Sequence, residues 1–231
     1  MAEPFRKSTI REYFDSIVIA LILALFVRTW VVQAFKIPTG SMENNLLIGD
    51  HLLVNKFVFG PTLSRVDRAL LPVRDIRRGD IIVFKYPIDP QRDFIKRVIG
   101  LPGDTVELKA KKVYINNQPL DEPYVHFLTP ASEGGEVTSM DVRERYGPVT
   151  VPPDQYFVMG DNRDNSQDSR YWSFLPRDHV KGKAMMIYWS YESGRDDYAD
   201  DGLGASIRRT LSVIGHFFTR TRWERLLHQI H

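Results

Sequence analysis

The clearest strand pattern in this 231-residue chain is Phe94-Ile95-Lys96-Arg97-Val98-Ile99-Gly100. β-Branched and aromatic residues dominate it and a glycine ends it, which is typical of a strand with little exposure to water. Lys96 is unusual in such a setting, because burial removes the solvation of its charge and lowers its pKa. Successive side chains of a strand point to opposite faces, so Arg97 should face away from Lys96.

Six other segments have the same strand character, and turn residues bound them: His51–Phe57, Asp80–Tyr86, Thr105–Leu108, Lys112–Ile115, Tyr156–Met159 and Ala184–Tyr191. Gly-Asp pairs at 49–50, 79–80, 103–104 and 160–161 mark turns or strand entries. No long amphipathic helix separates the segments, so the sheet should be largely antiparallel. We therefore predict a mainly β fold built around an antiparallel, barrel-like domain.

Residues 107–150 differ from the strands around them. They are more polar and less periodic, and they contain several turn formers, namely Pro119, Pro123, Pro130 and Gly134-Gly135. We interpret them as an inserted β subdomain, which divides the main domain into residues 36–106 and 151–193. Residues 194–231 follow as an acidic connector and a basic stretch with helical apolar spacing. That stretch is either an amphipathic helix on a membrane, a helix packed on the domain, or a solvated tail.

Residues 17–35 form a predicted transmembrane helix, and residues 1–16 precede it. Nineteen helical residues reach about 28 Å, close to the roughly 30 Å of a membrane's hydrocarbon core. Arg28 opposes insertion by ~2.5–3.5 kcal/mol, whereas the Leu, Ile, Val and Phe residues of the span together favour it by ~4–7 kcal/mol. Basic residues concentrate before the span, so the positive-inside rule places the N-terminus in the cytoplasm and the domain outside.

A cleaved secretory signal is the alternative for this segment. Residues 17–27 have the length of a signal core, and Val32-Gln33-Ala34 resembles a cleavage site. Arg28 and Trp30 lie between the two and argue against cleavage. We therefore predict a permanent anchor.

Composition excludes several classes of function. The net charge is only +2, which gives no indication of nucleic-acid binding. The chain has no cysteine, which excludes disulfides, thiolate metal sites and a cysteine nucleophile. Its six histidines show no HExxH spacing. We expect no metal, no cofactor and no nucleic-acid partner.

Two polar elements stand out beside Lys96. Ser41 follows the apolar segment, in Ile37-Pro38-Thr39-Gly40-Ser41-Met42, where a serine taken alone is usually a turn or cap residue. A dense polar loop occupies residues 160–170. A calcium loop is excluded there, because Arg163 takes a ligand position and Ser166 replaces the required glycine. Too few glycines are present for a phosphate loop, which leaves a hydrogen-bonded polar turn as the plain structural interpretation.

Five motifs occur in order behind the apolar segment: residues 38–42, Gly49-Asp50, residues 78–84, residues 96–104 and residues 160–166. In these motifs the chain resembles the bacterial type I signal peptidases (leader peptidases). These are Ser/Lys-dyad membrane-bound serine proteases that remove signal peptides from exported preproteins. The resemblance runs from the apolar segment to about Trp189. The last motif is highly specific, and Ser169-Arg170-Tyr171-Trp172 continues it.

The resemblance implies a catalytic role for three residues. Ser41 would be the nucleophile, and neutral Lys96 would be its general base. The backbone N–H of Ser41 and the hydroxyl of Thr39 would form the oxyanion hole. The family usually reads Ser-Met-x-Pro-Thr from the nucleophile onward, whereas residues 41–45 here read Ser-Met-Glu-Asn-Asn. Without the proline, the φ angle at that position is less constrained.

The resemblance also implies supporting roles and a fold. Ser166 would orient Lys96 through a hydrogen bond, while Asp168 and Arg170 would pair and brace the loop. Shallow pockets for small substrate side chains would be lined by residues from several strands, namely Phe35, Ile37, Met42, Val83 and Ile95. The fold implied is an all-β catalytic domain with the inserted second subdomain.

The activity implied is that of a membrane-anchored endopeptidase that cleaves preproteins after small residues, at Ala-x-Ala type sites. It would work on the outer face of the bacterial cytoplasmic membrane, with signal-peptide-bearing preproteins and the phospholipid bilayer as partners. A dedicated Ser/Lys processing protease with a single client is the main alternative. A self-cleaving relative of phage repressors is a further alternative, but it lacks support because no DNA-binding domain precedes Ser41. A non-enzymatic anchored β-domain would not need Ser41, Lys96, Thr39 and Ser166 together.

Overall fold

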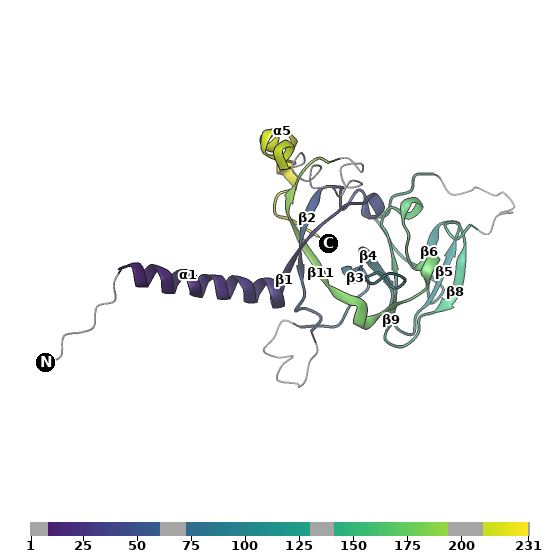
Figure 1. Cartoon of the computed structure of the whole chain (residues 1–231). Coiled ribbons are helices and arrows are strands. Elements are labelled where there is room, and N and C mark those ends of the chain that lie inside the picture. Colours follow the sequence, from purple (N-terminus) through teal and green to yellow (C-terminus); the bar gives the residue numbers. More distant parts are fainter. Residues whose placement is uncertain (1–8, 61–72, 130–140, 194–209, 231) are drawn as a thin grey trace.

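The computed structural model describes residues 9–60, 73–129, 141–193 and 210–230 of the chain. A single long helix projects from a β body, and the larger sheet of that body curls on itself (Figure 1). This sheet has the order β1-β2-β11-β3-β4-β9-β10, with β12 paired to β11, and a four-stranded sheet has the order β7-β6-β5-β8. The strand pairs are antiparallel. The mainly β, antiparallel fold predicted from the sequence is confirmed.

The larger sheet contains strands from both ends of the chain: β1 (Val32–Lys36), β2 (Asp50–Asn55), β3 (Ile81–Lys85), β4 (Asp93–Gly100), β9 (Gln155–Met159), β10 (Leu175–Pro176), β11 (Val180–Ser190) and β12 (His228–Gln229). Short helices connect them: η2 (Gly40–Met42), η3 (Arg163–Asn165), α3 (Ser169–Trp172), η4 (Arg177–His179), α5 (Phe217–Arg220) and η6 (Trp223–Arg225). The strands expected around Lys96 and in the other apolar segments are present, with bounds that differ by up to four residues.

The N-terminal helix begins earlier and ends earlier than the predicted span of 17–35. It comprises α1 (Thr9–Phe26) and a π-helical turn, η1 (Val27–Val31), which together form one apolar helix of 23 residues with none buried in the body. Its length is about 35 Å. Residues 32–35 instead belong to β1, whose register with β2 runs from Val32↔Asn55 to Lys36↔His51. Apolar composition alone does not separate a helix end from a strand start, and pairing with β2 decides it.

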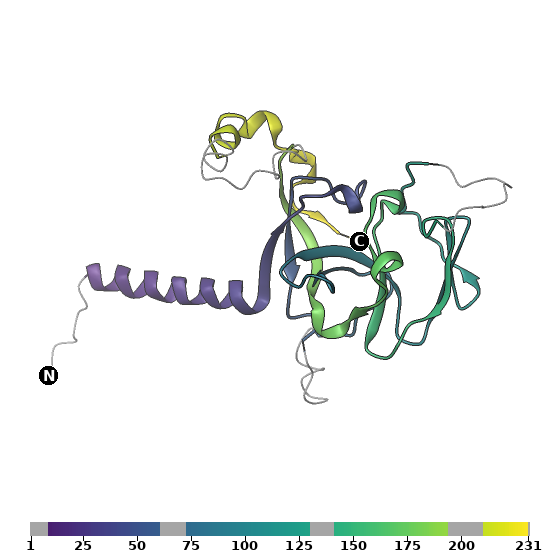
Figure 2. The same cartoon turned by 45° about the vertical axis from the view of Figure 1, so that its right-hand side comes forward.

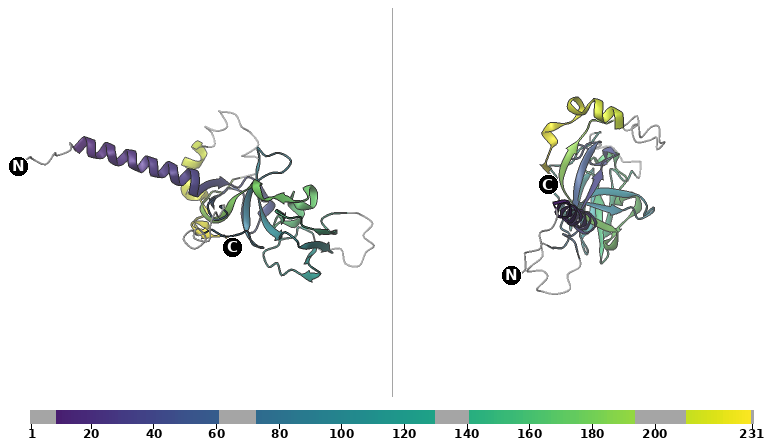
Figure 3. Two further views of the ribbon diagram at one scale, coloured as in Figure 1. Left: turned by 90° about the horizontal axis from the view of Figure 1, so that it is seen from below. Right: turned by 60° about the vertical axis from the view of Figure 1, so that its left-hand side comes forward.

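The smaller sheet consists of β5 (Thr105–Lys109), β6 (Lys112–Ile115), β7 (Gln118–Pro119) and β8 (Tyr146–Thr150). It begins at Thr105, two residues before the predicted subdomain. β7 and β8 did not show in the sequence, because prolines interrupt both strands. Figures 2 and 3 show this sheet at the end of the body opposite α1.

Buried side chains form three apolar clusters, one of which joins the sheets. Its members come from β4 and β9 of the larger sheet, from the smaller sheet and from the segment after it: Ile99, Val106, Leu108, Val113, Ile115, Val151, Phe157 and Met159. Another cluster combines buried side chains of β2, β3, β4 and β11 with Ile37, Met42 and Leu46. It fixes the segment that carries Ser41 onto the sheet.

Gly182 lies at a register shift in β11, where this strand passes close to β2. A Cβ added there would lie 2.3 Å from the Asn55 carbonyl oxygen and 2.9 Å from the Asn55 carbonyl carbon. Since these are backbone atoms of a paired strand, they cannot rotate away. We expect Gly182→Ala to lower the free energy of unfolding by ~1–3 kcal/mol, measured by urea denaturation of the detergent-solubilised protein.

Gly215→Ala is the matched control, because an added Cβ at Gly215 meets no atom within 4 Å. Its unfolding midpoint should stay close to that of the wild type. Equal midpoints for the two variants would contradict the close approach of β11 to β2.

Candidate active site

Ser41 lies in η2, in the loop that joins β1 to β2. Both ends of this loop are fixed, because the Ile37 N–H donates to the Asp50 carbonyl and the Gly49 N–H donates to the Ile37 carbonyl, each at 2.9 Å. The side chain of Met42 is fully buried beneath the turn. Ser41 itself is 7 % exposed. The serine is therefore held at the edge of the core with little solvent around it.

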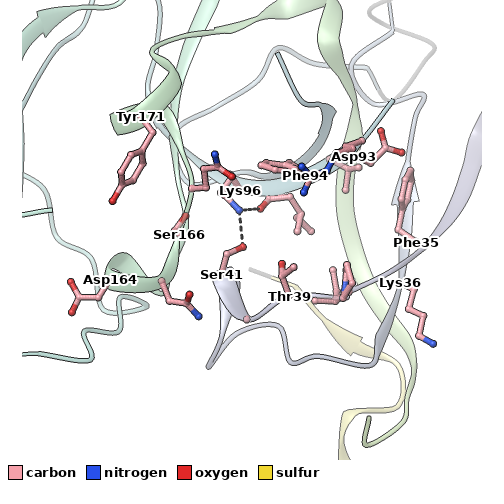
Figure 4. Close-up of a pocket in the computed structure, with 18 residues that line it drawn as sticks. Phe35, Lys36, Thr39, Ser41, Asp93, Phe94, Lys96, Asp164, Ser166 and Tyr171 are labelled. Carbon is pink, nitrogen blue, oxygen red and sulfur yellow. Dashed lines mark hydrogen bonds between the residues drawn. The ribbon is translucent and has the colours of Figure 1, made fainter. Parts of the chain in front are cut away.

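Lys96 lies on β4 and points to Ser41 (Figure 4). Its Nζ donates to Ser41 Oγ at 2.7 Å and to the Ile95 carbonyl oxygen at 3.0 Å. The Phe94 ring lies 5.4 Å from the same nitrogen, and Lys96 is only 3 % exposed. The structure thus brings the two most informative polar residues of the sequence into direct contact.

Burial lowers the pKa of Lys96 from 10.5 to about 8. Loss of solvation is the largest cause, because a charged amine is disfavoured away from water. The carboxylates of Asp168 and Asp161 raise this pKa and the Arg170 guanidinium lowers it, but burial prevails. A large share of Lys96 is therefore neutral in mildly alkaline solution, where the amine can accept a proton.

The polar loop of residues 160–170 packs directly on Ser41. The Asn162 N–H donates to the Ser41 carbonyl oxygen at 3.1 Å, and Asn162 Nδ2 donates to the Gly40 carbonyl at 3.1 Å. Only glycine fits at position 160, since a Cβ there would lie 2.4 Å from the Ser41 carbonyl oxygen and 2.3 Å from Ser166 Oγ. Gly160 therefore permits the loop to reach the serine.

Ser166 is buried beside Lys96 at the edge of the site (Figure 4). Between these two described side chains, however, the predicted hydrogen bond is absent. Lys96 Nζ is instead bonded to Ser41 Oγ and to the Ile95 carbonyl.

Asp168 and Arg170 form the ion pair expected from the sequence. Arg170 Nε and Nη2 donate to the two Asp168 oxygens at 2.8 Å each, and both side chains are fully buried. Burial alone would raise the pKa of Asp168, but the Arg170 charge and its hydrogen bonds hold that pKa below its usual value. Asp168 also accepts from the Gly160 N–H at 3.1 Å. The pair thus ties together both ends of the loop.

A second buried ion pair had no role in the sequence prediction. Arg97 points away from Lys96, as the strand geometry predicts, and binds Asp161 through Nε at 2.9 Å and Nη2 at 2.8 Å. The Tyr124 ring lies 3.8 Å from the guanidinium carbon of Arg97. The available signal was an arginine inside an apolar strand, because such a charge needs a buried partner.

A cavity of about 640 Å³ opens beside Ser41 and Lys96. Four of the predicted pocket residues line it: Phe35, Ile37, Val83 and Ile95. Met42 does not, because its side chain points into the core cluster and is fully buried, so that prediction is wrong. Thr39 lines the cavity next to Ser41 (Figure 4). The remaining lining includes charged residues that the sequence did not indicate, namely Lys36, Arg92, Asp93 and Asp164.

Among the residues that the structure describes, no group of three or more His, Cys, Asp or Glu side chains is arranged to hold a metal ion. The chemistry available at this site is that of a serine hydroxyl in contact with a buried amine.

Comparison with known proteins identifies the family. A family model described as "Signal peptidase, peptidase S26" matches residues 10–189. The chain belongs to the S26 family of signal peptidases. It is 37 % identical to a signal peptidase I of Pseudomonas aeruginosa, in a match that covers 78 % of this chain and 72 % of the relative. It is 41 % identical to a probable signal peptidase I-2 of Synechocystis, with 79 % and 75 % covered.

A crystal structure of a signal peptidase I from Enterococcus faecalis matches at 36 % identity, with 48 % of this chain and 97 % of that chain covered and a TM-score of 0.38. A TM-score this low carries no argument about the fold, so membership rests on the sequence matches. The family resemblance expected from the motifs is confirmed. The protein is a serine endopeptidase that cleaves signal peptides from preproteins.

The buried amine of Lys96 should cost stability. The unfolded chain holds its proton up to pH 10.5, whereas the folded state releases it near pH 8, so wild-type stability rises with pH between these values. Below pH 8 the buried, charged amine lowers the free energy of unfolding by about 3 kcal/mol. We therefore expect Lys96→Met to raise the free energy of unfolding at pH 7 by about 1–3 kcal/mol, and by less at pH 10.

Urea unfolding of the wild type and Lys96→Met at both pH values checks this expectation. Lys112→Met is the matched control, because Lys112 lies exposed on β6 and its replacement should leave stability nearly unchanged. A Lys96→Met variant that is less stable than the wild type at pH 7 would show that the buried amine does not destabilise the folded state.

Proposed function

We propose that this protein is a membrane-anchored signal peptidase I that uses Ser41 as its nucleophile and neutral Lys96 as its general base. The observation that carries the proposal is the 2.7 Å contact between Lys96 Nζ and Ser41 Oγ in a nearly dry environment. A serine hydroxyl is a weak nucleophile until a base removes its proton, and a base must lie within hydrogen-bond reach. Lys96 meets both conditions.

The proposed reaction has two stages. Ser41 Oγ attacks the carbonyl carbon of the peptide bond while its proton passes to Lys96 Nζ, and the tetrahedral intermediate collapses as the protonated amine delivers a proton to the leaving nitrogen. Water then attacks the acyl-enzyme ester with Lys96 again as base, and Ser41 is regenerated. No group outside this dyad is needed to balance the protons.

The negative charge on the intermediate needs hydrogen-bond donors. We assign this role to the Ser41 backbone N–H and the Thr39 hydroxyl, since both belong to the turn that borders the cavity. In other enzymes, removal of one such donor costs about 3–4 kcal/mol of transition-state stabilisation. Asp168 and Arg170 act indirectly, because their ion pair fixes the loop that packs on the dyad. Ser166 lines the cavity beside Lys96.

Specificity for small residues follows from the lining of the cavity. Phe35, Ile37, Val83 and Ile95 contribute to the cavity lining together with Ser41, and we assign to them the shallow pockets for alanine-sized groups that the family resemblance implies. A larger substrate side chain would clash with them. Cleavage after Ala-x-Ala type sites is the substrate rule that this lining supports.

Membrane anchoring is supported by the N-terminal helix. None of its 23 residues from Thr9 to Val31 is buried against the body, and its apolar side chains have no other cover in the described structure. The basic residues at the N-terminal side of the span favour an N-terminus in the cytoplasm and a β body on the outer face of the cytoplasmic membrane. Strand β1 joins the helix to the body and contributes Phe35 and Lys36 to the cavity lining, which supports a site one strand away from the membrane anchor.

The acidic limb of the rate profile tests the lysine base. Because the Lys96 pKa is about 8, protonated and inactive enzyme dominates at pH 6, and kcat/KM should rise about tenfold per pH unit before it levels off above pH 8. The measurement uses a peptide substrate without titratable side chains, between pH 6 and pH 10. A flat profile across this range would exclude Lys96 as the base.

Site-directed variants test the dyad directly. We expect the detergent-solubilised wild type to cut a preprotein after its Ala-x-Ala site, with mass spectrometry locating the cut. Ser41→Ala and Lys96→Ala should each lose at least about a thousandfold in rate. Lys112→Ala, an exposed lysine on β6, is the matched control and should cut at the wild-type rate.

The outcomes separate the alternatives. Full activity of Lys96→Ala would assign the base to another group, even if Ser41→Ala were inactive. A folded wild type that cuts one preprotein and ignores the others with Ala-x-Ala sites would be a dedicated processing protease.

A further inference from the structure

The C-terminal residues 221–230 return to the β body, and the last strand runs along the larger sheet (Figure 2). The Arg222 N–H donates to the Ser190 carbonyl and the Ile230 N–H donates to the Met185 carbonyl, each at 2.9 Å. Ile230 is only 9 % exposed. The end of the chain is therefore part of the fold, and the solvated-tail interpretation does not hold for these residues.

Arg225 is the strongest contact between this segment and the rest of the protein. Its Nη2 donates to Asp50 Oδ2 at 2.7 Å and to the Asn45 carbonyl oxygen at 2.8 Å, while Nε donates to Asp50 Oδ1 at 3.2 Å. Asp50 is fully buried, and a buried carboxylate needs a nearby positive charge. Arg222 is farther away, with 4.0 Å between its Nη1 and Asp50 Oδ1.

The two acceptors of Arg225 lie in the loop that carries the nucleophile. Asn45 follows Ser41 by four residues, and the N–H of Asn45 donates to the Met42 carbonyl at 3.2 Å. Asn45 Nδ2 donates to Asp161 Oδ2 at 2.7 Å, and the next residue, Asn162, donates its N–H to the Ser41 carbonyl. Arg225 thus binds the loop that carries Ser41. That loop is also hydrogen-bonded to the loop of residues 160–170, both at Ser41 and at Asn45.

Apolar packing reinforces the same connection. Ile230 belongs to the buried cluster that contains Met42 and Leu46. Met42 follows Ser41 directly and Leu46 lies five residues after it, and both are fully buried beneath the turn. The C-terminal segment therefore contacts the nucleophile loop through a charged group and through an apolar side chain.

We propose that Arg225 is a positioning residue for the nucleophile, which holds residues 42–50 so that Ser41 Oγ stays at hydrogen-bond distance from Lys96 Nζ. This inference rests on the proposed roles of Ser41 and Lys96. Without Arg225 the Asp50 carboxylate is left without its closest counter-charge, and the loop shifts to reach another partner or water. A shift of the nucleophile by about 1 Å is enough to lower the rate about a hundredfold.

The test compares Arg225→Ala, Arg225→Lys and the wild type in detergent, with an Ala-x-Ala peptide as substrate. We expect Arg225→Ala to lower kcat about tenfold to a hundredfold, while KM changes less than about twofold because the cavity lining is intact. The acidic limb of the pH profile should stay in place, because burial and the charges of Asp168, Asp161 and Arg170 set the pKa of Lys96 and the substitution changes none of them. Arg225→Lys keeps the charge but not the two-pronged geometry, so its kcat should lie between the other two.

Arg220→Ala is the matched control, since Arg220 is an exposed arginine of the same segment. It should keep the wild-type kcat. The folded fraction of each variant is measured by near-UV circular dichroism, and kcat is expressed per folded molecule. An Arg225→Ala kcat equal to that of the wild type, or a loss confined to KM, would overturn the proposal.

Asp50→Asn provides a second route if Arg225→Ala does not fold. It removes the charge that Arg225 binds and leaves Arg225 itself in place, so the proposal requires a lower kcat with an unchanged KM. An unchanged kcat in this variant would overturn it. Ser41→Ala and Lys96→Ala run in parallel: activity in either would refute the proposed dyad, whereas inactivity in both with full activity in the Arg225 and Asp50 variants would refute only the positioning role.

Discussion

The burial of the Lys96 amine beside Ser41 is the constraint on which the proposed chemistry depends, because removal from water lowers the pKa of a primary amine toward neutrality. Lys96 lies on a strand in the interior of the larger sheet, with Phe94 beside its nitrogen. As a result, only 3 % of Lys96 is exposed to solvent. The same burial that lowers its pKa to about 8 also weakens the fold, so reactivity and stability oppose each other at this residue.

The charges near the amine are arranged in pairs, which limits their effect on it. Asp168 and Asp161 would favour a protonated Lys96, but each carboxylate binds an arginine through two hydrogen bonds. Buried ion pairs of this kind contribute little net stability, because desolvation offsets their attraction. Their value here is structural: they fix the polar loop that packs on Ser41 without leaving a net negative charge beside the base.

The site also depends on how the chain enters and leaves the β body. The N-terminal helix continues through one π-helical turn into β1, so Phe35 and Ile37 bring the membrane-side segment directly to the cavity. The C-terminal segment returns to the same region through Arg225 and Ile230. Strand β1, which follows the N-terminal helix, and the C-terminal segment therefore both border the loop that carries Ser41, although they are far apart in sequence.

The sequence by itself determined the fold class, the family and the candidate dyad of Ser41 and Lys96, because strand periodicity and short motifs are local signals. The family resemblance also implied the Asp168–Arg170 pair, which is present in the structure. Tertiary structure alone decided that residues 32–35 form a strand, that Met42 packs into the core, and that Lys96 donates a hydrogen bond to Ser41 and not to Ser166. It likewise decided the partners of Arg97, Asp50 and Arg225. These features depend on contacts between segments distant in sequence, and residue patterns along the chain do not encode which side of a turn faces the core.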